Sequence, residues 1–141
     1  MATEPPPQGM VILYPYLWAS ERNAGETEGR KPRPACLILR VRDPARAIHH
    51  LVLLAITSEP PRRTQAAIEI PDTERRRGGL IRYPRAWVIV SEYNHDVAEQ
   101  SWYYEPNAPA LGRFSAPFVR EVANALRAGL SRSLARVDRT R

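Results

Sequence analysis

Residues 35–56, ACLILRVRDPARAIHHLVLLAI, contain two apolar runs that decide the fold of this chain. The runs Ala35–Val41 and His50–Ile56 have the length of β-strands and are rich in branched aliphatic side chains, which favour strands. Residues 42–48, which separate them, predict a turn. Because His50–Ile56 is almost entirely apolar, we expect it to lie centrally in a sheet.

Further strands are predicted on both sides of this region. They are Met10–Leu17, Ala66–Ile70 and Trp87–Ser91, and Pro15 makes the second half of the first one an edge or a bend. Residues 18–34 and 75–84 predict loops, the first long and polar, the second basic with a Gly-Gly pair.

A C-terminal helix is predicted from Phe118 onward, where apolar residues recur at helical spacing. Ser115 is suited to cap its N-terminus, and Pro117 falls in the first turn, where proline is tolerated. Strands followed by one amphipathic helix predict a mainly β protein, a small curved antiparallel barrel with the helix packed against it. We divide the chain into a Pro-rich arm (1–9), one barrel domain (10–134) and a frayed basic tail (135–141).

The charge of the chain favours a polyanionic partner. Its formal net charge is +6, and Lys31 is the only lysine, so nearly all of the positive charge is arginine. Arginine binds phosphate through two parallel hydrogen bonds and stacks on bases. The alternative source of the arginine preference is the codon usage of a GC-rich genome, but this does not explain the net excess over acidic residues.

Several other classes are disfavoured by the sequence. No apolar run is long enough for a membrane span, and the N-terminus lacks the pattern of a signal peptide. Cys36 is a lone cysteine, so we expect a reducing cytoplasm. No phosphate-binding glycine loop or metalloprotease motif is present. His49 and His50 are adjacent and would point to opposite faces of a strand, so we expect neither a metal site nor a cofactor.

Polar residues at strand ends are the candidate functional residues. The segment GRKPRPA places Arg30, Lys31 and Arg33 before the second strand, and two prolines restrict the backbone at Arg33. Thr57 and Ser58 end the third strand, where hydroxyl groups can reach a ligand at the rim. The alternatives are a solvated basic loop and a Ser/Thr turn that only stops the strand.

Aromatic side chains offer stacking surfaces for unpaired bases, or else belong to the core or a subunit interface. They include Tyr14, Tyr16, Trp18, Trp102, Tyr103 and Tyr104.

Read together, these segments resemble the MazF/PemK/Kid toxins of type II toxin–antitoxin systems, in particular a PemK-like branch. The resemblance runs from about Gly9 to Leu130 and is carried by GMVILYPYLW, AGETEGRKPRPACLIL, LVLLAITS, AAIEIP and GLIRYPRAWVIVSEYN. Its most specific parts are the Arg-Pro pair entering a strand and the Thr-Ser pair after the next apolar strand.

The resemblance implies an SH3-like barrel with a C-terminal helix, a homodimer, and sequence-selective cleavage of single-stranded RNA without a metal. In that reaction the ribose 2′-hydroxyl attacks the adjacent phosphorus and leaves a 2′,3′-cyclic phosphate and a 5′-hydroxyl. Arg33 and Thr57 match the catalytic positions, and the expected partner besides RNA is an antitoxin with an acidic segment. We expect the RNA to be bound by Arg30, Lys31, Ser58, Trp18, Arg82 and Arg85.

A separate proton acceptor is needed, because a guanidinium group stays protonated near neutral pH. Glu21 is our first candidate for this general base, followed by Glu28 and His95. The chain departs from the family at Ile81, where the most similar branch tends to carry an acidic residue. The remaining alternatives are a non-catalytic RNA- or DNA-binding barrel and a partner-binding module of the same fold.

Overall fold

The fold is mainly β, with a large antiparallel sheet and few helices. The computed structural model describes residues 7–20, 31–105, 109–130 and 135–139. Its elements are β1 (Met10–Tyr14), β2 (Arg33–Asp43), β3 (Ile48–Thr57), β4 (Ala67–Glu69), α2 (Asp72–Arg77), β5 (Trp87–Ile89), β6 (Glu92–Val97), β7 (Gly112–Arg113), α3 (Ala116–Leu130) and β8 (Ala135–Asp138).

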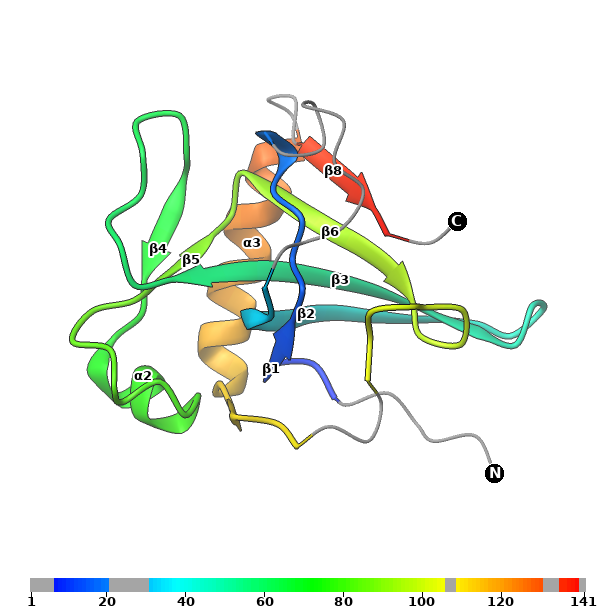
Figure 1. The fold of residues 1–141 in the computed structure, drawn as a ribbon, viewed down its shortest axis with the longest axis horizontal. Coiled ribbons are helices and arrows are strands. Elements are labelled where there is room, and N and C mark those ends of the chain that lie inside the picture. The colour runs from blue at the N-terminus through cyan, green and yellow to red at the C-terminus, as the bar shows by residue number, and fades with distance from the viewer. Residues whose placement is uncertain (1–6, 21–30, 106–108, 131–134, 140–141) are drawn as a thin grey trace.

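The strands form one bent sheet in the order β4-β5-β3-β2-β1-β7, with β6 paired to β3 and β8 paired to β6 (Figure 1). Among the described strands, β4 and β7 end this order and do not pair with each other, so the sheet is open. The pairs are antiparallel except β6 with β8, which run parallel.

The long β2–β3 hairpin is the centre of the sheet, as residues 35–56 predict. β3 pairs with β2, β5 and β6, and four of its side chains, Leu51, Leu53, Leu54 and Ala55, are fully buried. The hairpin extends far beyond the other strands (Figure 1), with its turn at residues 44–47. The expected central position of His50–Ile56 is therefore confirmed.

Two apolar clusters pack on opposite faces of the sheet. One lies between the sheet and α3, which crosses behind β2 and β3 in Figure 1, and contains Leu54, Val122 and Phe114. The other contains Leu37 and Leu53, under the segment that follows β1. The helix begins as predicted, because the Ser115 hydroxyl accepts a hydrogen bond from the backbone N–H of Phe118 at 3.4 Å.

Three predictions about elements were wrong or incomplete. Residues 72–77, partly inside the predicted loop 75–84, form α2, which has acidic residues in its first turn and Arg75, Arg76 and Arg77 in its last, as the helix dipole favours. Strand β6 was not predicted, because its sequence EYNHDV has no apolar face. The expectation that the basic tail is frayed is wrong for residues 135–138, which form β8 beside β6, and Arg139 beyond it is only 3% exposed.

The ends of the chain differ in how far they are described. Residues 1–6 of the predicted arm lie outside the described residues, whereas Gly9 donates a backbone hydrogen bond to Leu37 at 2.7 Å. β1 ends at Tyr14, where Pro15 follows, as the sequence indicates. Within the described ranges, no helix is both long and apolar enough to cross a bilayer.

Candidate functional site

A pocket lies where the first residue of β2 and the last residue of β3 meet. Arg33 begins β2 and Thr57 ends β3, and because these strands are antiparallel the two ends lie side by side. The pocket has a volume of about 290 Å³ and is lined by Arg33, Pro34, Ile56, Thr57, Ser58, Glu59 and Tyr83. This is close to the lower end, about 300 Å³, of the range for small-molecule sites, so it suits one small polar group.

Arg33 has donor capacity left for a ligand. Its guanidinium carbon lies 5.2 Å from the centre of the Trp18 ring, a cation–π distance. Its Nε atom is buried and, in the described part of the chain, has no hydrogen-bond partner. A buried donor without a partner is rare in proteins. Because Arg33 also lines the pocket, its guanidinium group brings positive charge to this end of the pocket, which favours an anion.

The Thr57 hydroxyl forms two hydrogen bonds with the backbone of Glu59. It accepts a hydrogen bond from the backbone N–H of Glu59 at 3.1 Å and donates to the Glu59 carbonyl at 3.3 Å. This is the Ser/Thr turn that the sequence allowed as an alternative. Because the same turn lines the pocket, it also fixes Ser58 and Glu59 beside Arg33.

Tyr83, which lies between α2 and β5 in the chain, completes the pocket lining. Its carbonyl accepts a hydrogen bond from the Arg75 guanidinium at 2.7 Å, so α2 holds this part of the lining in place. Asp72 holds Arg75 in turn, at 2.8 Å. The guanidinium carbon of Arg82 lies 6.0 Å from the centre of the Tyr83 ring, at the limit of a cation–π contact.

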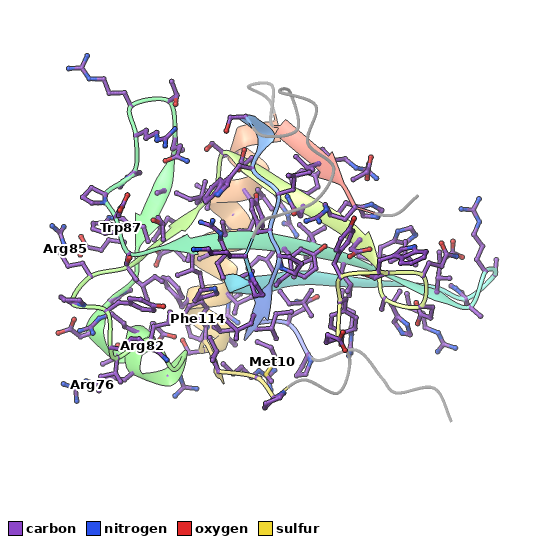
Figure 2. The ribbon with its side chains drawn as sticks, viewed as in Figure 1. Met10, Arg76, Arg82, Arg85, Trp87 and Phe114 are labelled. Atoms are coloured by element: carbon purple, nitrogen blue, oxygen red, sulfur yellow. The ribbon has the colours of Figure 1, made fainter. Side chains whose placement is uncertain are left out.

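A third arginine–aromatic pair lies next to the pocket. Arg85 lies over the Trp87 ring at 4.8 Å and forms two hydrogen bonds to the Glu69 carboxylate, at 2.9 and 2.8 Å. These bonds hold the pKa of Glu69 below its ordinary value. Figure 2 shows Arg82, Arg85 and Trp87 at the same end of the molecule as Arg76 of α2.

Trp18 is positioned by β6 and by the C-terminal segment. Asn94 forms hydrogen bonds with both the backbone N–H and the carbonyl of Leu17, at 2.9 and 2.8 Å. The Glu92 carboxylate accepts from the backbone N–H of Ala19 at 3.0 Å. The polar row on β6 is therefore buried because it satisfies the backbone around Trp18.

The structure brings most of the predicted site residues together. Arg33, Thr57 and Ser58 line the pocket, and Trp18, Arg82 and Arg85 stand against or beside its lining. Lys31 is exposed, two residues before Arg33. Arg30, Glu21 and Glu28 lie outside the described residues.

His95 does not belong to this pocket. It lies opposite Val52 on β3, five residues before Thr57, which is about 16 Å along a strand. Its ring stacks on His50 at 5.2 Å and its Nδ1 atom contacts Asp138 at 2.8 Å. In the described ranges no group of three or more His, Cys, Asp or Glu side chains is arranged to hold a metal ion.

Two pocket residues were missed by the sequence analysis. Glu59 directly follows the Thr-Ser pair, so the sequence could have indicated it as the next residue of the predicted turn. Tyr83 is separated from Thr57 by β4 and α2, and no local pattern relates it to the pocket.

Comparisons with protein-family models, with curated proteins and with solved structures found no match to this chain.

Proposed function

We propose that this protein is a metal-independent endoribonuclease that cleaves single-stranded RNA at the pocket between Arg33 and Thr57. The observation that carries the proposal is the meeting of these two residues in one pocket. The sequence resemblance assigns them the catalytic positions independently of any geometry. The Arg33 side chain lines this pocket, and a guanidinium group is a donor suited to a phosphoryl oxygen.

The proposed reaction uses the ribose of the RNA itself. The 2′-oxygen attacks the adjacent phosphorus, the bond from phosphorus to the 5′-oxygen breaks, and a 2′,3′-cyclic phosphate remains. Arg33 donates hydrogen bonds to the phosphoryl oxygens, where negative charge develops. Removing a donor of this kind lowers kcat by about 100- to 1,000-fold in other enzymes. The Ser58 hydroxyl, also in the pocket lining, supplies a further donor.

Glu59 is the carboxylate that we propose as the general base. It accepts the proton of the 2′-hydroxyl, and the departing 5′-oxygen takes a proton from water. The turn made by Thr57 holds the backbone of Glu59, so Thr57 positions the base as well as lining the pocket. Glu59 replaces Glu21 as our first candidate because it lines the pocket together with Arg33.

The broader features of the resemblance belong to the same proposal. We propose an SH3-like barrel, a homodimer and a cytoplasmic location, with an acidic antitoxin segment competing with RNA for the pocket. The β-rich sheet with a helix on one face supports the barrel, and the net charge of +6 supports an acidic partner.

A second candidate function is RNA binding without cleavage. Two observations favour it, namely the use of the Thr57 hydroxyl within its own turn and Ile81 in place of an acidic residue. Such a protein would bind single strands with a strong dependence on salt, because phosphate contacts weaken steeply with ionic strength.

The test is incubation of the purified protein with a long unstructured RNA in excess EDTA, followed by mapping of the fragment ends. Arg33→Ala, Thr57→Ala and Glu59→Gln are compared with Arg46→Ala, a control on the exposed β2–β3 turn far from the pocket. Discrete cuts with 2′,3′-cyclic phosphate ends, retained in Arg46→Ala and lost in Arg33→Ala, are expected. Intact RNA with salt-sensitive binding supports the second candidate.

A further inference from the structure

The residues beside the pocket form a row across three strands on one face of the sheet. Thr57 of β3 lies opposite Trp87 of β5, and Trp87 lies opposite Glu69 of β4. Residues that are directly opposite in antiparallel strands project from the same face. Since neighbouring strands are about 4.8 Å apart, the Trp87–Glu69 part of the row adjoins the pocket at Thr57.

Arg85 lies over this row. Its guanidinium carbon lies 4.8 Å from the centre of the Trp87 ring, and both of its hydrogen bonds to Glu69 leave from the edge of the guanidinium plane. Two parallel bonds to one carboxylate fix the orientation of that plane. The Arg85 side chain is 61% exposed although Trp87 covers one of its sides, so its outer side faces solvent.

Arg85 is poorly suited to the role of phosphate ligand that the sequence suggested. Glu69 occupies the Nε and Nη2 donors and balances the positive charge, so an incoming phosphate would compete with a carboxylate already in place. Three of the five N–H groups and the outer plane of the guanidinium group remain available, and the plane is the part with no competing partner charge directly against it. Such a plane stacks on nucleobases in single-stranded RNA complexes.

We propose that Arg85, held by Glu69 and Trp87, is a stacking platform for the nucleobase that adjoins the scissile phosphate. The inference rests on the proposed function in that single-stranded RNA is the ligand. It assigns the three residues to base binding rather than to phosphate binding or catalysis. A role only in joining β4 to β5 is the competing explanation, although a surface ion pair of that kind contributes little to stability.

The test is a binding experiment with short 2′-O-methyl RNA oligonucleotides, which lack the attacking hydroxyl and so stay intact. One nucleotide after another is replaced by an abasic residue, and binding is measured in EDTA. For the wild-type protein we expect one abasic position next to the preferred site to weaken binding about 5- to 100-fold, the size of a lost base–aromatic stack.

We expect Arg85→Ala to bind the unmodified oligonucleotide as weakly as the wild-type protein binds the abasic one. An abasic residue at that position should cause no further loss in Arg85→Ala. Arg85→Lys keeps the positive charge but has no planar group, so it should behave like Arg85→Ala. Arg46→Ala is the matched control, and thermal unfolding verifies that each variant is folded. Equal weakening of every oligonucleotide, or no change in Arg85→Ala, overturns the platform.

The two proposals fail separately. If RNA stays intact in EDTA, while the loss of binding at one abasic position disappears in Arg85→Ala, the platform stands and the ribonuclease proposal fails. If RNA is cut at discrete positions and no abasic position depends on Arg85, the ribonuclease proposal stands and the platform fails.

Discussion

The Nη1 atom of Arg139 donates a hydrogen bond to the carbonyl of Pro15, joining the C-terminal end of the described chain to the segment that follows β1. The same atom lies 3.2 Å from the Asn94 side-chain oxygen, and the guanidinium carbon lies 4.0 Å from the centre of the Tyr103 ring. Asn94 binds Leu17, beside the Trp18 that packs on Arg33. Arg139, which is buried directly after β8, therefore supports the wall of the pocket that β2 and β3 form.

Arg139→Ala should destabilise the protein by at least about 2 kcal/mol, because it leaves the Pro15 carbonyl and Asn94 without a charged donor. Urea denaturation measures this free energy of unfolding. Arg136→Ala is the matched control, since Arg136 lies on β8 but is half exposed, and a change within about 0.5 kcal/mol is expected. Equal effects of the two substitutions would contradict the anchoring role of Arg139.

Glu59→Gln should lower the rate of RNA cleavage by about 100- to 10,000-fold, the usual contribution of a general base. RNA binding should persist, because the amide keeps the size of the side chain and removes only its basicity. Single-turnover cleavage and a separate binding titration distinguish the two effects. Glu121→Gln, on the exposed face of α3, serves as the control. Undiminished cleavage by Glu59→Gln would exclude Glu59 as the base.

Acidification should reduce stability through His95. Burial and the nearby Arg136 lower the pKa of His95 in the folded protein, against the opposing effect of Asp138. As the pH falls through the ordinary histidine value of about 6.5, the unfolded chain takes up a proton before the folded protein does. The free energy of unfolding therefore decreases from pH 7.5 towards the lower folded pKa.

Urea denaturation at several pH values checks this expectation. His95→Gln should flatten the dependence, while His49→Gln, which changes the histidine bound to Glu99, should retain the contribution of His95. His50 also contacts His95 and repels it when both are charged, so it acts in the same direction. Stability that rises on acidification in wild-type protein would refute the assignment.

Cys36 should not react with thiol reagents in the native state. Its side chain is fully buried, and burial raises the pKa of the thiol to about 12, so almost no thiolate exists near neutral pH. Labelling of the native protein should proceed only through unfolding, and its rate should rise with urea. Rapid labelling without urea would show that the β1–β2 pair, in which Cys36 lies opposite Val11, opens easily.

The sequence by itself determined the elements whose side chains divide clearly between core and solvent. The runs at 35–41 and 50–56 became the central hairpin, and the helical spacing after Ser115 became α3, because apolar periodicity records which face of an element is buried. It also indicated Arg33, Thr57 and Ser58, since they stand at the ends of those recognisable strands.

The tertiary structure alone decided where polar residues are buried and which distant segments meet. β6 has a polar buried side because Glu92 and Asn94 bind backbone groups of residues 17–19, contacts that no periodicity within β6 encodes. Partners elsewhere in the chain likewise decide the positions of β8, Arg139 and Tyr83, and the contacts that join Arg85 to Trp87 and Glu69. Local sequence patterns reflect burial of apolar area, whereas hydrogen-bond partners of buried polar groups are fixed only when the segments pack together.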